Sequence, residues 1–240
     1  MKIVDLQACT ASVPLEIPVE FATRVVRDRQ FTIVRLRRQD GVEGIGYCYV
    51  GNKAGRLGAI AVRDLLKESV VGQDSDQVEQ IWDAMYRDSL LQGRQGMVLR
   101  VMSAIDNALW DANAKAAGLP LYKYLGGFRE GTVPTYASGG YYHSSAKPAD
   151  LAREVEGYVS MGFRAVKIKV GRLSPEEDAR RLEAARNVVG SKVSIFLDAN
   201  NAWNDAATAI RAIKLFEPYD PGWIEEPVLP EDVDISATIA

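Results

Sequence analysis

The sequence contains little histidine and cysteine, and it lacks any long hydrophobic run. One histidine and two cysteines occur among 240 residues, and Cys9 and Cys48 lack the spacing of metal-binding or redox motifs. We therefore expect both to be reduced thiols in the core. The N-terminus does not resemble a signal peptide, and no apolar run reaches the roughly 18 residues of a membrane-spanning helix. These absences favour a cytoplasmic protein that does not enter the membrane.

The charge is balanced rather than strongly basic. Lysine and arginine number 29, aspartate and glutamate number 32, and the formal net charge is -3. Nucleic-acid binding requires a basic patch or stripe, and none is present. Nucleic acid is therefore excluded as an expected partner, and a composition of 47% hydrophobic and 25% charged residues predicts a globular protein with a packed core.

The first half of the chain has the pattern of strands followed by helices. Residues 2–12 and 31–37 are rich in β-branched residues, as strands are. From about residue 58 to 117, apolar residues recur at helical spacing, and Gly118 and Pro120 end this pattern. Residues 1–125 are therefore predicted to form an α+β domain.

The second half alternates strands with helices, which predicts βα units of a parallel (β/α) barrel. We expect strands at 133–138, 165–170, 193–199 and 222–226 and helices at 149–161, 175–189 and 205–216, the second helix capped by Ser174. Residues 126–240 would then form a barrel domain with about four βα units.

Polar residues end these strands at intervals of one βα unit: Ser138, Lys169, Asp198 and Glu225. The carboxyl ends of parallel strands meet at one edge, where catalytic groups of barrel enzymes gather. Lys167 and Lys169 are two positions apart on one strand, so both side chains point to the same face, the interior of the barrel. We expect these two ammonium groups to lower each other's pKa, so that one can act as a base.

The acidic residues at the next two strand ends predict a metal site. Asp198 and Glu225 would supply oxygen ligands, which suit a hard cation such as Mg²⁺. An acidic residue after a strand is often only a helix cap or a solvated turn. Lysines that face carboxylates across the same edge make the metal-site interpretation stronger.

The runs FRAVKIKVG, FLDANNAW and WIEEPVLPED, together with MSAIDNALWDANAKAAGLPLYKYLGG upstream, resemble the enolase superfamily in its mandelate racemase and muconate lactonising enzyme branch. The resemblance covers essentially the whole chain and implies a capping domain followed by a modified TIM-like barrel. It implies that Asp198 and Glu225 are two of three ligands of an essential Mg²⁺. Lys169 would be the general base, Lys167 would contact the substrate carboxylate, and Asn200 would orient the base or the substrate.

The resemblance also implies the reaction: Mg²⁺-dependent removal of the proton α to a carboxylate, with stabilisation of the enediolate. We expect a lyase or isomerase that acts on a small carboxylate substrate, either an acid-sugar dehydratase or a hydroxy-acid racemase, and that is a homo-oligomer as a complete protein. A muconate-type cycloisomerase, an amino-acid epimerase and an o-succinylbenzoate synthase remain alternatives within the superfamily.

Other residues have weaker predicted roles. Ser138, Tyr142 and His143 lie at or after the first barrel strand, where they would touch substrate or simply lie at the surface. Residues 16–30 and 50–58 are expected to be loops that close over the barrel edge.

The chain departs from the family in its number of βα units. Four strands are expected rather than eight, and a third metal ligand and an opposing base are absent. We therefore expect a truncated barrel that is inactive alone. A Schiff-base aldolase that uses Lys167 or Lys169, and a non-catalytic assembly fragment, are alternatives of other classes.

Overall fold

The computed structural model describes residues 1–127, 132–143 and 147–240. The chain divides into two compact units. Unit 1 contains Met1–Glu16 and Arg27–Gly131, and unit 2 contains Ile17–Val26 and Thr132–Ala240. Each unit has its own hydrophobic core.

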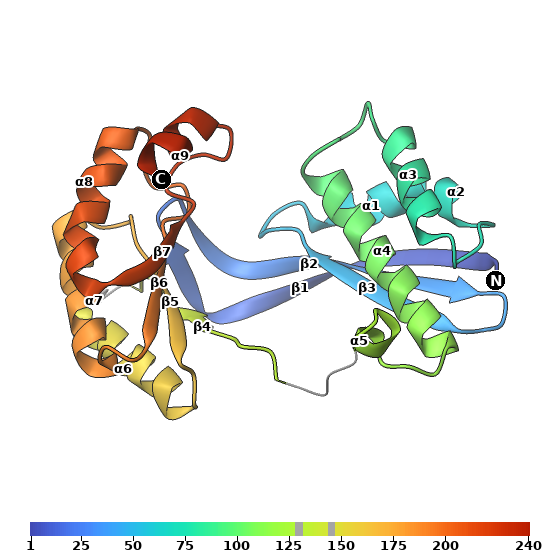
Figure 1. The fold of residues 1–240 in the computed structure, drawn as a ribbon. Coiled ribbons are helices and arrows are strands. Elements are labelled where there is room, and N and C mark those ends of the chain that lie inside the picture. Colours follow the sequence, from blue (N-terminus) through green and yellow to red (C-terminus); the bar gives the residue numbers. More distant parts are fainter. Residues whose placement is uncertain (128–131, 144–146) are drawn as a thin grey trace. The chain divides into compact units, whose positions relative to one another are not determined.

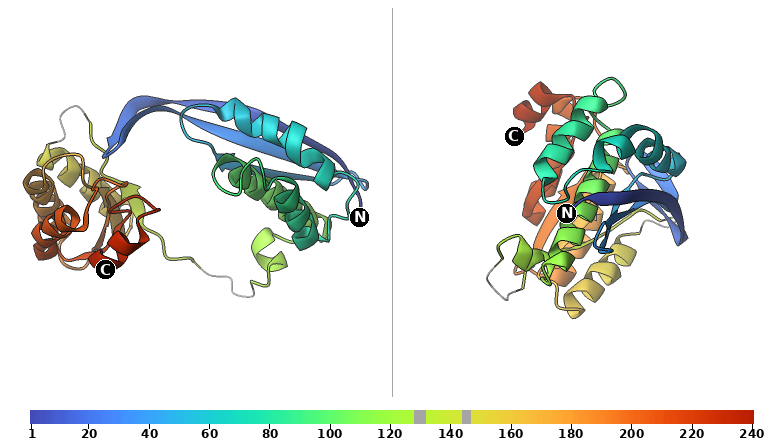
Figure 2. Two further views of the ribbon diagram at one scale, coloured as in Figure 1. Left: turned by 90° about the horizontal axis from the view of Figure 1, so that it is seen from above. Right: turned by 90° about the vertical axis from the view of Figure 1, so that its right-hand side faces the viewer.

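Unit 1 is built on a three-stranded sheet in the order β1 (Ile3–Phe21), β2 (Arg24–Arg38) and β3 (Glu43–Tyr49). β1 and β2 run side by side as a long ribbon joined by a two-residue turn (Figures 1 and 2). β2 and β3 are antiparallel, with Val34 opposite Gly46. Alternate residues of β2, such as Val34 and Leu36, are buried, because successive side chains of a strand point to opposite faces.

The prediction of a loop at residues 16–30 is wrong. Apart from Ala22 and Thr23, these residues belong to β1 and β2. The β-branched and aromatic residues Ile17, Val19 and Phe21 occur at every second position, and this pattern suits an extended strand better than a loop.

The helices of unit 1 pack against the sheet and share one hydrophobic core with it. They are α1 (Gly55–Ala61), the π-helix η1 (Val62–Leu66), α2 (Lys67–Val70), α3 (Val78–Asp88), α4 (Met97–Ala116) and α5 (Leu121–Tyr124). α4 packs directly on β3, where a Cβ added to Gly46 would lie 2.0 Å from the carbonyl oxygen of Ala104. Glycine therefore permits a helix backbone to approach a strand backbone here.

The two cysteines of unit 1 differ in burial. Cys48 is buried on β3 and Cys9 is exposed on β1. The prediction that both lie in the core is wrong for Cys9, because neighbouring positions of an edge strand alternate between the core face and solvent.

Unit 2 contains a parallel sheet in the order β4 (Ala137–Gly139), β5 (Ala165–Lys169), β6 (Ser194–Asp198) and β7 (Pro221–Glu225). These strands agree with the predicted ones within a residue or two, except that β4 begins at Ala137 rather than at 133. The four βα units of a partial barrel are thus confirmed.

Helices follow the strands in alternation, as Figure 1 shows. They are α6 (Pro148–Ser160), α7 (Pro175–Val189), α8 (Ala206–Phe216) with the 3₁₀ turn η2 (Glu217–Tyr219), and α9 (Val233–Ile239). The predicted cap of α7 is confirmed, since Ser174 and Glu177 form a reciprocal capping box.

The tip of the β1–β2 ribbon belongs to unit 2. Glu20 exchanges two backbone hydrogen bonds with Tyr142, at 3.1 and 2.9 Å. Arg172 pairs with the carboxylate of Glu20 at 2.5 Å and donates to the carbonyl of Phe21 at 3.2 Å. The tip is therefore held beside the carboxyl ends of β4 and β5 within unit 2.

Candidate active site

Two lysines and two carboxylates meet at the carboxyl ends of three adjacent strands of unit 2. Lys169 is the register partner of Asp198, and Asp198 is the partner of Glu225. The Nζ of Lys169 lies 2.5 Å from Oδ2 of Asp198. The Nζ of Lys167 lies 2.7 Å from Oε1 of Glu225 and 3.4 Å from Oδ2 of Asp198. We call these four residues the rim cluster.

The rim cluster is sheltered at its centre and open at one side. Lys169 is 7% exposed and Asp198 is 2% exposed, whereas the Glu225 side chain is 34% exposed. Paired opposite charges make this burial tolerable, because an unpaired buried charge is strongly disfavoured.

The pKa of Lys167 lies above its ordinary value. Burial alone lowers it, but the hydrogen bond to Glu225 and the charges of Asp198 and Glu225 together raise it. The expectation that two neighbouring ammonium groups lower each other's pKa is therefore wrong for Lys167. The attraction between its ammonium group and the two carboxylates outweighs the repulsion from a second ammonium group.

The loops that follow β6 and β7 adopt an uncommon backbone conformation. Asn200, Asn201 and Glu226 all have positive φ, at 46°, 60° and 51°. Such strain in residues other than glycine is typical of functional sites. It places the Asn200 N–H 3.0 Å from Oδ1 of Asp198 and its side-chain amide 3.1 Å from Oε2 of Glu226.

The side-chain oxygen of Asn200 is a free acceptor beside the rim cluster. It is buried, and it has no hydrogen-bond partner among residues 1–127, 132–143 and 147–240. A buried acceptor without a donor is costly, and a ligand with hydroxyl groups would satisfy it.

Aromatic rings surround the lysines, and sequence reasoning missed them. The Nζ of Lys169 lies 5.8 Å from the ring centre of Phe21 and 5.3 Å from that of Tyr141. Tyr136 lies in the same relation to Lys167, at 5.6 Å. These are cation–π distances, and they place apolar walls beside two charged groups.

A stacked pair of rings lies one level below the carboxylates. Phe196 and Trp223 are parallel, with centroids 3.5 Å apart, and each lies two residues before a carboxylate on its strand, Asp198 and Glu225. Residues i and i+2 of a strand share a face, so this spacing is the signal that would have predicted the rings.

The remaining predicted site residues lie apart from the rim cluster or at its margin. Ser138 is the register partner of Lys167 and is exposed. His143 is exposed and lines a different cavity with Tyr141 and Glu154. Tyr142 is buried, and its hydroxyl donates to Asp178. The predicted substrate contacts of these three residues stay predictions.

The donor set of the rim cluster fits a magnesium ion in part. No group of three or more histidine, cysteine, aspartate or glutamate side chains that could hold a metal occurs in the described part of the chain. Asp198 and Glu225 nevertheless point to one place, and the ammonium of Lys167 lies within 3.4 Å of both as a stand-in cation. Mg²⁺ is commonly held by one or two carboxylates plus water and substrate oxygens, so these two carboxylates suit it.

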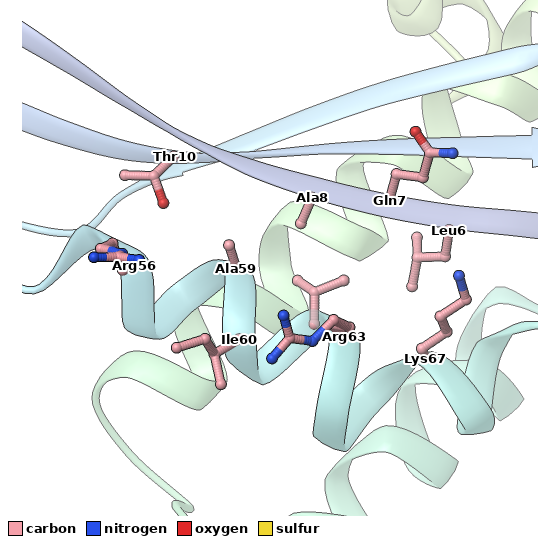
Figure 3. A pocket seen from close by; sticks show the side chains of 10 residues that line it. Leu6, Gln7, Ala8, Thr10, Arg56, Ala59, Ile60, Arg63 and Lys67 are labelled. Carbon is pink, nitrogen blue, oxygen red and sulfur yellow. The ribbon is translucent and has the colours of Figure 1, made fainter.

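A separate cavity of about 660 Å³ lies in unit 1 between β1 and the helix formed by α1 and η1 (Figure 3). Its lining includes three cations, Arg56, Arg63 and Lys67, on the helical side. Its lining residues include no carboxylate, and its lysine, Lys67, pairs with the part-exposed Asp5 at 3.3 Å rather than with a buried carboxylate at a strand end. We therefore assign it no part in the chemistry proposed below.

The chain combines an α+β unit with parallel βα units, and two lysines face two carboxylates at the carboxyl edge of the parallel sheet. Two family models match the chain. Residues 3–126 match "Mandelate racemase / muconate lactonizing enzyme, N-terminal domain", and residues 150–240 match "Enolase C-terminal domain-like". The chain belongs to the mandelate racemase and muconate lactonizing enzyme family of the enolase superfamily, whose members depend on Mg²⁺.

Curated proteins and solved structures agree with this family. A 3,6-anhydro-alpha-L-galactonate cycloisomerase from Streptomyces coelicolor is 37% identical over 88% of this chain and 58% of its own length. A crystal structure of a racemase from the same species with bound magnesium superposes with a TM-score of 0.92 at 35% identity, covering 99% of this chain and 66% of that one. The crystal structure of an L-talarate/galactarate dehydratase mutant from Salmonella typhimurium, liganded with Mg and L-glucarate, superposes with a TM-score of 0.90 at 31% identity. The match covers 100% of this chain and 61% of that one.

The chain spans 58% of the length of the curated cycloisomerase. No helix in the described residues is long and apolar enough to cross a membrane.

Proposed function

We propose that this chain contributes to an Mg²⁺-dependent enzyme that removes the proton α to the carboxylate of an acid sugar or hydroxy acid. The observation that carries the proposal is the rim cluster, in which Lys167 and Lys169 face Asp198 and Glu225 within 3.4 Å. The relatives named above support the reaction class, since they include a cycloisomerase, a racemase and a dehydratase.

In this proposal Lys169 is the general base. It ends β5, nearer the edge of the sheet than Lys167. Lys169 acts in its neutral amine form: the C–H bond at the α-carbon breaks, the proton passes to the lone pair of Nζ to give an ammonium group, and the electron pair of the C–H bond moves into the carboxylate as an enediolate. Lys167 would hold one carboxylate oxygen through its ammonium group, and the free oxygen of Asn200 would accept a substrate hydroxyl.

Magnesium bound to Asp198 and Glu225 would stabilise the negative charge that develops on the substrate carboxylate. Both carboxylates already pair with ammonium groups, so their side chains are oriented toward a cation. Phe21 and Tyr141 would exclude water on the side of Lys169 and so strengthen the interactions there.

The test is exchange of the α-proton in D₂O, followed by NMR with a panel of acid sugars: galactarate, L-talarate, arabinonate, L-rhamnonate and D-gluconate. We expect Mg²⁺-dependent exchange that is lost by several orders of magnitude in Lys169→Ala, whereas Lys192→Ala, an exposed lysine at the opposite end of the sheet, exchanges normally. Wild-type exchange in Lys169→Ala would show that the base lies elsewhere. Lys167→Ala should weaken substrate binding as well.

The same spectra distinguish the alternatives. A dehydratase forms a 2-keto-3-deoxy acid, a racemase or epimerase forms a stereoisomer, and a cycloisomerase opens or closes a ring without loss of water. Borohydride trapping of substrate on Lys167 or Lys169 would instead favour a Schiff-base aldolase. We expect the 240 residues alone to be inactive, since their described part supplies only two suitable carboxylates, so any longer product of the gene is assayed in parallel.

We also propose that residues 1–125 and 126–240 are separate domains, and that the complete protein is a cytoplasmic homo-oligomer. The first family match, which ends at residue 126, supports the boundary. Exposed apolar side chains on the outer face of β3, Ile45, Tyr47 and Tyr49, support self-association. Native mass measurement tests the oligomer, and fractionation of cells tests the location.

A further inference from the structure

A second polar cluster lies behind the rim cluster in unit 2, and no role in the reaction has been given to it. It consists of Tyr142, which follows β4, and of Asp178 and Arg181 on α7. Their exposed fractions are 1%, 0% and 2%. The hydroxyl of Tyr142 lies 2.7 and 2.8 Å from the two oxygens of Asp178. Nη1 of Arg181 donates to Asp178 at 2.8 Å, and the guanidinium lies 4.1 Å from the centre of the Tyr142 ring.

The composition of this cluster does not indicate that its role is to stabilise the fold. A buried ion pair often contributes less than well-packed apolar side chains of the same volume. Nε of Arg181 is also buried without a hydrogen-bond partner in the described residues, which costs further free energy. The contacts of the cluster with the backbone suggest another role.

Among the described residues, the remaining polar contacts of these side chains go to the backbone at the carboxyl ends of β4 and β5. Arg181 donates to the carbonyl of Lys169 at 3.0 Å and to that of Gly140 at 2.8 Å. Asp178 accepts from the N–H of Gly171 at 2.7 Å, and the hydroxyl of Tyr142 accepts from the N–H of Arg172 at 3.3 Å. The cluster thus fixes the peptide groups where β5 ends and its loop begins.

The contact with Lys169 is the important one. The carbonyl of Lys169 receives its hydrogen bond from a buried arginine that is itself fixed by Asp178. The orientation of this peptide group determines the direction in which the lysine side chain leaves the strand. Because Nζ lies roughly 6 Å from Cα in an extended lysine, a rotation of the backbone by about 10° would move Nζ by about 1 Å, and a misplacement of this size can cost a factor of about 100 in rate.

We propose that Arg181, held by Asp178 and Tyr142, is a positioning residue for Lys169 in the proton-transfer step. The proposal rests on the function proposed above. Arg181 touches neither substrate nor metal, and it acts on the reaction through the backbone of the base.

The first test replaces the ion pair by uncharged side chains of similar volume, Arg181→Met together with Asp178→Asn. In the active enzyme, with the acid sugar of the panel that exchanges fastest, we expect kcat for α-proton exchange to fall about 10- to 100-fold. KM and the Mg²⁺ concentration at half-maximal activity should change less than twofold. A loss of melting temperature alone, with kcat unchanged well below the transition, would overturn the proposal.

Arg186→Met is the matched control. Arg186 lies on the same helix and also donates to backbone carbonyls, those of Tyr219, Gly190, Val193 and Asp220. These carbonyls lie before β6 and β7, at the amino ends of the strands. This variant should lose stability but keep the wild-type kcat.

Two further measurements separate positioning from a general structural role. Arg181 lines a cavity with Tyr141, His143 and Glu154, so guanidinium ions at millimolar concentration should enter the space left in Arg181→Ala and restore part of kcat. In a Lys169→Ala background the Arg181 substitution should cause no further loss, because it acts through the missing lysine. Equal losses in both backgrounds would overturn the proposal.

The outcomes also distinguish this proposal from the proposed function. If Lys169→Ala exchanges at the wild-type rate, the assignment of the base is wrong. If Lys169→Ala loses several orders of magnitude in exchange rate and the Arg181 variants are normal, only the positioning role is wrong. Should both Arg181 variants fail to fold, Tyr142→Phe, which removes one hydroxyl, should lower kcat severalfold with unchanged KM, and a normal kcat there would equally contradict the proposal.

Discussion

Replacing Asp198 by asparagine removes one negative charge from between two ammonium groups while the shape of the side chain is kept. Asp198 is 2% exposed and lies 2.5 Å from Lys169 and 3.4 Å from Lys167. Lys167 retains Glu225 as a partner, at 2.7 Å, but Lys169, itself 7% exposed, loses its carboxylate. Removing one partner of a buried ion pair costs about 3–5 kcal/mol, because the remaining charge is left uncompensated. We expect a loss of free energy of unfolding in this range for the metal-free protein at pH 7.

The assay is urea denaturation in EDTA, with hydrogen exchange of β5 and β6 peptides to isolate the unfolding of unit 2. Asp205→Asn is the control, since Asp205 is an exposed cap of α8 and asparagine caps about as well as aspartate. Adding Mg²⁺ at about 100 times its Kd should stabilise the wild type by about 2.7 kcal/mol and should not stabilise Asp198→Asn. A loss below about 1 kcal/mol in EDTA, or equal stabilisation of both proteins by Mg²⁺, would refute the reasoning.

Three further predictions concern packing, capping and pH. Gly46→Ala should lower the free energy of unfolding of unit 1 by about 3 kcal/mol or more, because the new methyl group would meet the α4 backbone; Gly157→Ala, in open space on α6, should stabilise by up to about 1 kcal/mol, and urea denaturation compares the two. Ser174→Ala should cost about 1 kcal/mol through the lost capping box of α7, measured by thermal denaturation. The pKa of Lys167 is raised above 10.5 in the folded protein, so its ion pair with Glu225 should contribute fully below that pH and be lost as the pH rises through the raised value. The difference in stability between wild type and Glu225→Gln should therefore stay constant from about pH 7 to about pH 10 and shrink above it; a difference that grows at high pH would contradict this sign.

The sequence was sufficient to predict the βα alternation, because buried parallel strands and amphipathic helices have different periods. It also predicted that Lys169, Asp198 and Glu225 end neighbouring strands, and they are register partners in the sheet. The spacing along the chain contains no distances across strands. It therefore did not predict that each lysine pairs with a carboxylate, so that the pKa of Lys167 is raised rather than lowered.

Contacts between distant parts of the chain were the other limit. Phe21 approaches Lys169 because the tip of the β1–β2 ribbon joins unit 2, whereas Tyr141 follows β4, the strand beside β5. The positioning role proposed for Arg181 could not be predicted either. Its partner is a backbone carbonyl, which every residue type has, so the sequence does not indicate the contact. Local periodicity predicts helices and strands, but it does not predict which of them contact one another.

The ribbon tip also sets an order of events during synthesis. Phe21 accepts a hydrogen bond from Arg172, which lies 151 positions later in the chain. At about 5–20 residues per second, the ribosome adds the partner roughly 8 to 30 seconds after the tip has been made. For most of that interval the ring of Phe21 lacks its contact with Tyr141, and the apolar side chains Ile17 and Val19 lie beside it on the same tip. The nascent chain thus exposes an apolar, extended hairpin before its partners in unit 2 exist. We expect a chaperone to bind this hairpin first.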